Sequence, residues 1–251
     1  MCNFCGTLLI CLLFALPAYA RQSMFDLPPV ASPPLYGNIL INRISTKNHQ
    51  LPVVFSHWEH RAKDTCRVCH FELGFMMQKN TTEITEEANR RGKFCGACHN
   101  GKIAFGHTKK NCKKCHNGNR TYGWQKFTAF SAKLPQAPTG NKIDWVKAVE
   151  EGLIKPRQSL TDKNYTPMPY NKELQLRAEW NMIPPAFFPH KKHNLWLDCA
   201  NCHPDIFNIK KKTTKHFSMV NNLKGKFCGV CHLKVSFPMN DCGRCHPKMA
   251  Y

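Results

Sequence analysis

The sequence Gly92-Lys93-Phe94-Cys95-Gly96-Ala97-Cys98-His99 contains the pattern that decides the fold: two cysteines two residues apart, followed at once by histidine. This Cys-x-x-Cys-His motif occurs six times in the 251 residues. The six copies are Cys66/Cys69/His70, Cys95/Cys98/His99, Cys112/Cys115/His116, Cys199/Cys202/His203, Cys228/Cys231/His232 and Cys242/Cys245/His246. Of the 15 cysteines, the motifs leave over only Cys2, Cys5 and Cys11.

This spacing is the one that covalent haem attachment requires. Two thiols add to the two vinyl groups of one haem, and the adjacent histidine reaches the iron as proximal ligand. Zinc would use the cysteine pairs two at a time, and six disulfides would be natural in an exported chain. Neither alternative explains a histidine after every pair. We therefore expect six covalently bound c-type haems, one at each motif.

The six motifs form two similar sets of three. A shift of 133 residues superimposes 92–99 on 225–232 with one mismatch, and the third motif of each set is offset by 130. Such self-similarity indicates a duplicated structural unit. The sequence therefore predicts two three-haem modules, residues 49–120 and 184–251.

Each module opens with Phe-x-His-x-x-His, at Phe55, His57 and His60 and again at Phe188, His190 and His193. With this opener the sequence resembles the class III multihaem cytochromes, specifically the triheme c7-type domains of the cytochrome c3 superfamily. The resemblance covers both modules and leaves out the N-terminal arm and the central segment. It implies that His57 and His190 are distal ligands of the first haem in each module. It also implies that His60 and His193 serve the second haem.

The distal ligands of the third haem in each module stay open. In similar triheme repeats this ligand lies between the first and second motifs, where the second module offers His216 and Met219. The place of Met219 is taken in the first module by Glu86, a poor iron ligand. Further candidates are His107, Met76 and Met77 in the first module and Met239 in the second.

Between the motifs we expect mainly coil with short α-helices and negligible β-sheet. A module of about seventy residues can hardly build a core from protein alone, so haem must supply much of the apolar interior.

Outside the modules we expect a Pro-rich arm over 21–48 and a linker with one short helix over 121–183. Residues 39–41 are a short strand candidate. The helix is predicted over 141–152, with Asn141 or Asp144 as its cap and with an apolar face formed by Val146, Val149 and Leu153.

Residues 6–20 are almost wholly apolar and end in Ala18-Tyr19-Ala20, which fits the cleavage pattern of a secretory signal. We expect a cleaved signal peptide over 1–20, export to the periplasm or to the cell exterior, and no membrane span in the mature chain. Because Met1–Cys5 has no Lys or Arg, an uncleaved anchor stays open as the alternative.

The chain carries 36 Lys plus Arg against 16 Asp plus Glu, a formal net charge of +20. Such a balance suggests nucleic acid, anionic lipid or an acidic protein as partner. Six haems would bring twelve propionates, which lower the charge to +8, and six ferric centres would raise it again to +14. We therefore expect redox proteins with acidic docking surfaces as partners, and no nucleic acid.

The expected function is electron transfer by hopping between haems, in an anaerobic or metal-reducing type of respiratory chain, and not enzymatic catalysis. Two alternatives remain. A multihaem reductase for nitrite, hydroxylamine or a sulfur oxyanion would need one haem with an open coordination position. A haem filament would need self-association, for which His49 could bind the haem of a neighbouring subunit.

Overall fold

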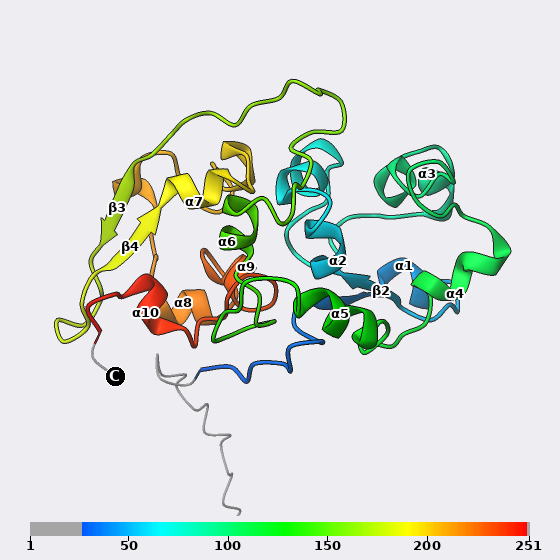
Figure 1. Ribbon diagram of the computed structural model, residues 1–251. Coiled ribbons are helices and arrows are strands. Elements are labelled where there is room, and N and C mark those ends of the chain that lie inside the picture. Colours follow the sequence, from blue (N-terminus) through cyan, green and yellow to red (C-terminus); the bar gives the residue numbers. More distant parts are fainter. Residues whose placement is uncertain (1–26, 250–251) are drawn as a thin grey trace, which may run out of the picture.

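The computed structural model describes residues 27–249, so the predicted signal peptide and its three cysteines lie outside the described residues. Most of the described chain is coil joined by short helical pieces and two small sheets, which confirms the expected fold class (Figure 1). The α-helices are α1 (Arg43–Lys47), α2 (His57–Arg61), α3 (Glu86–Arg90), α4 (Cys112–Cys115), α5 (Trp124–Ser131), α6 (Trp145–Glu150), α7 (His190–Asn194), α8 (Met219–Leu223), α9 (Gly229–His232) and α10 (Cys242–Cys245). Tighter or wider helical turns are η1 (Val68–Glu72), η2 (Phe94–Ala97), η3 (Lys109–Asn111), η4 (Cys199–Asn201) and η5 (Lys211–Thr213).

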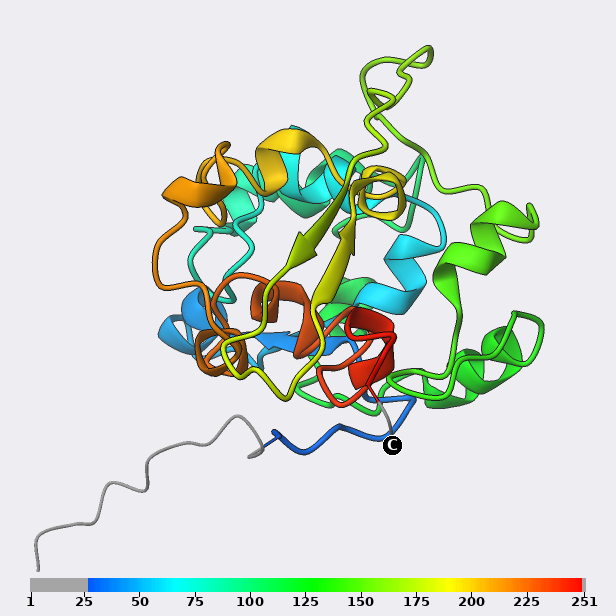
Figure 2. The ribbon, with the colours of Figure 1, turned by 90° about the vertical axis from the view of Figure 1, so that its left-hand side faces the viewer.

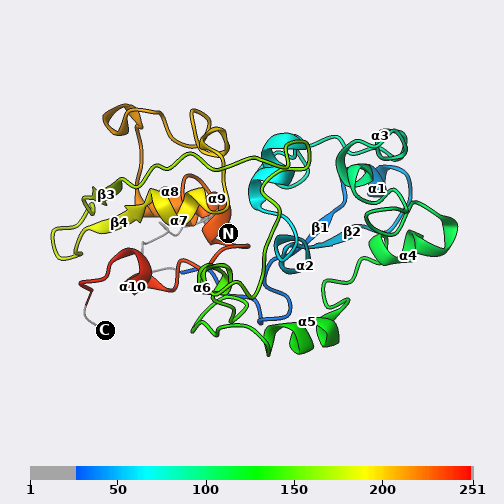
Figure 3. The same cartoon turned by 45° about the horizontal axis from the view of Figure 1, so that its top comes forward.

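Both sheets are antiparallel pairs that lead into the opener histidines. Strand β1 (Asn38–Ile41) pairs with β2 (Val53–Ser56), and β3 (Glu173–Leu176) pairs with β4 (Ala186–Pro189). The strand predicted at 39–41 is thus β1. Helix α2 follows β2 directly and α7 follows β4 directly, so each hairpin delivers its opener histidines on a short helix. Figure 3 shows the two hairpins in separate halves of the molecule.

The repeated block of sequence forms the same chain reversal in both halves. Helices α3 and α8 begin after Thr85 and Ser218, whose hydroxyls accept hydrogen bonds from the backbone amides of Ala88 and Asn221. A Cβ atom at Gly96 or Gly229 would lie 1.8 Å from the carbonyl oxygen of Asn89 or Asn222 respectively. Only glycine permits this close approach of the motif to the preceding helix.

The central segment contains two helices, α5 and α6, where the sequence predicted one. Gly123, in the left-handed region at φ 81°, begins α5 without a side-chain cap, so the usual start signal is missing there. Helix α6 is capped by Asp144, whose carboxylate accepts a hydrogen bond from the amide of Lys147. Asn141 instead accepts from the indole N–H of Trp145, at 3.1 Å.

The predicted apolar face of this helix was right at Val149, which packs against the protein core, and wrong at Leu153. Trp145 and Ala148 are its buried residues, whereas Leu153 is 52% exposed. The chain leaves the helix at Glu151 and turns at Gly152, at φ 70°, so Leu153 no longer follows the helical period.

The protein core lies where the two halves and the central segment meet. Its buried members are Trp58, Phe127, Leu134, Ile143, Trp145, Ala148, Ile154 and Trp196. Trp58 belongs to α2 and Trp196 follows α7, while the other six come from 127–154. The segment expected as a linker is therefore the part that packs the halves together (Figure 1). Beyond it, the chain projects from the rest of the molecule before it reaches β3 (Figure 2).

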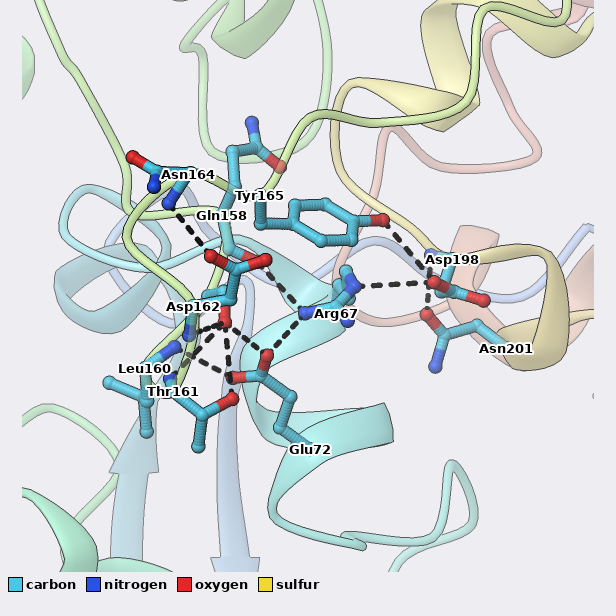
Figure 4. A network of polar contacts seen from close by, with 11 residues as sticks. Arg67, Glu72, Gln158, Leu160, Thr161, Asp162, Asn164, Tyr165, Asp198 and Asn201 are labelled. Carbon is cyan, nitrogen blue, oxygen red and sulfur yellow. Dashed lines mark hydrogen bonds and ion pairs between the residues drawn. The ribbon is translucent and has the colours of Figure 1, made fainter.

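Arg67, the second residue of the first motif, links this motif to the second half of the molecule by an ion pair (Figure 4). Its guanidinium donates to the Glu72 carboxylate at 2.5 Å and to the Asp198 carboxylate at 3.2 Å. The Tyr165 ring lies 3.8 Å from the guanidinium carbon. Asp198 immediately precedes Cys199, so this one side chain joins the first motif to the fourth.

Within residues 27–249, no helix has the length and apolar character that a membrane crossing requires.

The close approach at Gly229 provides a test of this packing. We expect Gly229→Ala to destabilise the protein by about 3 kcal/mol, because the methyl group overlaps a backbone carbonyl that cannot move aside. That corresponds to a fall of about 10 °C in the thermal midpoint for a chain of this size.

The control is Gly225→Ala, where the new Cβ would be 3.9 Å from the nearest atom and only the backbone conformation, at φ 80°, resists substitution. We expect a loss of about 1–2 kcal/mol there. Equal thermal midpoints of the two variants would contradict the packing described here.

Candidate haem sites

Each motif forms about one helical turn. In five of them the backbone amide of the histidine donates to the carbonyl of the first cysteine, with N–O distances of 2.8–3.0 Å; these are the motifs that begin at Cys95, Cys112, Cys199, Cys228 and Cys242. Residues three and four positions apart on such a turn share one face. Both sulfur atoms and the imidazole of a motif are therefore presented to the same side, as one haem requires.

All six motif histidines are held in the same way by their Nδ1 atoms, each of which donates to a backbone carbonyl at 2.6–3.1 Å. The acceptors of His70, His99, His116, His203, His232 and His246 are, in that order, Phe75, Phe105, Leu51, Phe207, Phe237 and Pro184. A carbonyl can only accept, so the proton sits on Nδ1 and the lone pair is left on Nε2. Metal-binding histidines are typically oriented by such a bond.

The four opener histidines share this arrangement. His57 donates to Gly37, His60 to Ser56, His190 to Lys172 and His193 to Pro189, at 2.7–2.9 Å. Among the described residues, His49, His107 and His216 make no hydrogen bond of this kind. The side chains that the sequence singled out thus divide into ten anchored imidazoles and three free ones.

Two opener histidines face motif histidines at a distance that suits a shared metal. The ring centres of His60 and His99 are 6.2 Å apart, and those of His193 and His232 are 6.3 Å apart. Two imidazoles that bind one metal from opposite sides, each at about 2 Å, have ring centres about 6 Å apart. Phe55 stacks on His60 with 4.2 Å between ring centres, so the opener phenylalanine fixes the ring plane.

Burial keeps five of the anchored imidazoles neutral. It lowers the pKa of His57 to about 3 and that of His232 to about 4. It also lowers the pKa of His60, His70 and His193 below the ordinary histidine value. A neutral imidazole is the form that binds metal.

Burial also keeps Cys69 and Cys228 protonated, since it raises the pKa of both thiols to about 12. All twelve are free thiols, and no cluster of three or more His, Cys, Asp or Glu side chains in residues 27–249 is arranged to hold a metal ion alone. Zinc would need thiolates gathered around one point, an arrangement that the described residues do not show.

A large cavity of about 1710 Å³ lies between the halves and is lined by residues of both. It exceeds an ordinary ligand pocket, which is about 300–1,000 Å³. Motif residues in its walls include Cys66, Cys69, His70, Cys95, Cys202, Cys228, Cys231, His232, Cys242, Cys245 and His246. Apolar side chains such as Ile39, Val53 and Phe188 complete the walls. Thiols, neutral imidazoles and an apolar lining fit several haems together.

The structure does not place His203, predicted as a proximal ligand, in the wall of this cavity. Its imidazole is partly buried and bonded to the carbonyl of Phe207, and a cis peptide bond joins it to Pro204. Cys202 is the member of its motif that lines the cavity, whereas Cys199 is exposed. The fourth motif therefore stands at the edge of the cavity and presents one thiol to it. The role of His203 as an iron ligand stays a prediction that rests on its motif.

The third motif also lies outside the wall of the central cavity. Cys112 is exposed, Cys115 and His116 are partly buried, and none of the three lines the central cavity. Helix α4, which carries this motif, packs on β2 at the far end of the first half (Figure 1). The thiol of Cys115 is close enough to that of Cys95 to interact with it electrostatically, so a haem attached there would neighbour that of the second motif. The ligand role of His116 also stays a prediction.

The family model for cytochrome c7 and related cytochrome c matches residues 53–117 and 186–247. The chain belongs to this family. It is a multihaem c-type cytochrome, with tandem c7-type domains and covalently bound haem, as the resemblance implied.

Among solved structures, this cytochrome is similar to the C-terminal hexaheme fragment of GSU1996, with 25% identity over 87% of this chain and 98% of that chain and a TM-score of 0.28. For the dodecaheme cytochrome c GSU1996 the identity is 24%, the coverage is 85% and 75%, and the TM-score is 0.30. For its N-terminal hexaheme fragment the identity is 25%, the coverage is 85% and 99%, and the TM-score is 0.27. No curated protein matches the chain.

The two halves of the cytochrome differ where the third distal ligand was sought. Met219 is the first residue of α8, is partly buried and lines the central cavity. Glu86 occupies the same place on α3, where it is exposed and forms an ion pair with Arg90 at 2.6 Å. The structure thus repeats the helix without repeating a side chain that binds iron.

The other candidates for the third distal ligand lie in different parts of the structure. His107 is exposed and shares a small pocket of about 270 Å³ with His99 of the second motif, away from the third motif that follows it in sequence. His49 and His216 are exposed, as is Met76 at 58%. Met77 is partly buried, and Met239 is buried and lines the cavity.

Sequence reasoning missed the groups that orient the third histidine of each half. His116 is held by the carbonyl of Leu51 and His246 by that of Pro184, 65 and 62 residues earlier in the chain. Both acceptors lie just before a hairpin's second strand. No residue type marks a backbone carbonyl, so the sequence held no signal for them.

Replacing one opener histidine tests the anchored set. In His193→Ala we expect one low-spin haem to become high-spin, because the ring facing His232 is lost. Added imidazole should restore the low-spin spectrum. The control is His216→Ala, which removes an unanchored, exposed imidazole and should leave the spectrum unchanged. A change in His216→Ala with none in His193→Ala would contradict the division drawn here.

Proposed function

We propose that this chain is an exported hexahaem cytochrome that carries electrons by hopping from haem to haem between redox proteins. The observation that carries the proposal is the shared anchoring of ten imidazoles, of which two pairs face each other at 6.2 and 6.3 Å. The rings are held with Nε2 free to bind iron, and in the two pairs they can do so from both sides, which favours redox chemistry over substrate binding at those irons.

The roles of the residues follow from this arrangement. The twelve motif cysteines would form the thioether links, and the six motif histidines, His203 and His116 included, would be the proximal ligands. His57 and His190 would be the distal ligands of the first haem in each module, and His60 and His193 those of the second. Met219 would serve the third haem of the second module, for which its place beside the cavity supplies the support. We propose residues 49–120 and 184–251 as the bounds of the modules.

Electrons would pass from one module to the other at the junction between them. Arg67 joins the first motif to Asp198 beside the fourth, and the thiols of Cys66, Cys202 and Cys231 are close enough to interact electrostatically. Haems attached there would be neighbours, so that electrons entering one module could leave from the other. The haem supplies the one-electron chemistry when bound, while the chain sets spacing, ligands and local charge.

The net charge supports the choice of partner. Lysine and arginine are in such excess that the net charge would stay positive after the haem propionates are added. This positive charge would attract proteins with acidic docking surfaces. Export to the periplasm fits the amino-terminal segment of the sequence, and an anaerobic or metal-reducing type of chain fits a carrier with many haems.

One observation favours a second candidate function. Because Glu86 is exposed and pairs with Arg90, the position that would supply a distal ligand to the third haem holds none in the first module. A haem open on one side could bind nitrite, hydroxylamine or a sulfur oxyanion, as in a multihaem reductase.

The mass of the holoprotein and its spectrum with carbon monoxide test the proposal together. We expect six haems on one chain, all low-spin, with no binding of carbon monoxide by the native protein. One high-spin haem that binds carbon monoxide would favour the reductase. A mass without covalent haem would overturn both candidates.

A further inference from the structure

Arg61 lies at the centre of the junction between the modules. It follows the opener His60 at the end of α2, and its guanidinium carbon is 4.6 Å from the ring centre of Trp145 and 4.6 Å from that of Trp196. Trp145 belongs to α6 of the central segment, and Trp196 belongs to the second module. One guanidinium is therefore clamped between two indoles that come from different parts of the chain.

Arg61 has no acceptor among the described residues for its N–H groups. Its Nε is buried without a hydrogen-bond partner, and it forms no ion pair with any residue of 27–249. The second module has Asn194 at the equivalent place, bonded to the carbonyl of Tyr170. Arg67, only six residues away in sequence, shows the usual arrangement, with two carboxylates around one buried guanidinium.

Other buried donors of residues that line the same cavity are also unsatisfied, one of them on Trp196, which stacks on Arg61. The indole Nε1 of Trp196 and the hydroxyl of Thr65 are buried without partners. A buried donor left unpaired costs about 1–3 kcal/mol, and more when it is charged. Unpaired donors on both Arg61 and the Trp196 ring that it stacks on indicate that an anionic acceptor belongs to the holoprotein at this point.

The surroundings restrict what the acceptor can be. Arg61 lines the central cavity, whose walls carry cysteines of every motif except the third. The titratable groups that interact with it electrostatically are Cys66, Cys231, Tyr36, His57 and His232, and no carboxylate of the described residues is among them. When haem is attached at these motifs, the carboxylates that enter the cavity are its propionates.

We propose that Arg61, together with the indole N–H of Trp196, binds a haem propionate in the central cavity and holds that haem at a raised reduction potential. This inference rests on the proposed function. A fixed positive charge disfavours the ferric haem, which carries one more positive charge than the ferrous form, and a water-poor site strengthens the effect. Because the cavity receives haems from both modules, the arginine would tune the step between them.

The test is haem-resolved redox titration of the full-length holoprotein and of Arg61→Gln. We expect the ferric-to-ferrous equilibrium of one haem to shift about tenfold toward ferric, which is about 59 mV lower for one electron. The haem that shifts identifies the source of the propionate, in either module. Arg61→Lys keeps the charge but loses the planar stack, so it should keep the potential and lower the thermal midpoint. A control, Arg91→Gln, removes an exposed arginine that lines neither cavity, and it should leave all potentials unchanged.

Six haems with unchanged potentials in Arg61→Gln would overturn this inference and leave the proposed function standing, whereas loss of covalent haem from the parent protein would remove the proposed function itself. If Arg61→Gln does not mature, Trp196→Phe decides, because it keeps a stacking ring and loses the N–H donor. A fall in the potential of one haem supports the proposal, and unchanged potentials overturn it.

Discussion

The hydrogen bond from Nδ1 of an imidazole to a backbone carbonyl is the interaction on which the rest of this structure depends. It recurs at ten histidines, and it fixes at each the atom that is free to bind iron. At His116 and His246 it also joins the last motif of each half to the hairpin at the start of that half, because the accepting carbonyl lies in that hairpin. Ligand orientation and chain path are thus set by the same contacts.

The two halves share the elements that carry the haem-binding motifs, but they differ in side chains near the third haem and at the junction between the halves. The hairpin, the opener helix and the turn at Gly96 or Gly229 are repeated. The differences fall at Glu86 against Met219 and at Arg61 against Asn194. The central segment has no counterpart and supplies six of the eight core residues. Divergence after duplication has therefore placed distinct side chains at the third haem and at the junction.

Side-chain chemistry at fixed spacing could be predicted from the sequence, whereas contacts made by the backbone could not. The six motifs, the openers, the strand at 39–41 and helix α6 each depend on residue types that carry a pattern. The carbonyl acceptors carry none, and identical motifs did not reveal that His203 lies outside the central cavity while His232 lines it. The extra helix α5 was missed because it begins at Gly123, a left-handed glycine without a side-chain cap. The exposure of Leu153 was missed because Gly152, also left-handed, turns the chain just after α6. Asp198 beside Arg67 is 131 residues distant in the chain, a pairing that no local pattern marks.

The small protein core leaves haem as the main interior of both modules. The central cavity is larger than an ordinary pocket, and the eight buried core residues lie mostly in one segment. A chain of this kind should fold only as its haems are attached, as small metal-dependent domains do. Hydrogen exchange on the haem-free chain tests this most directly. The account predicts no protected amides in either module and no cooperative thermal transition; protected amides in β1, β2, β3 and β4 without haem would contradict it.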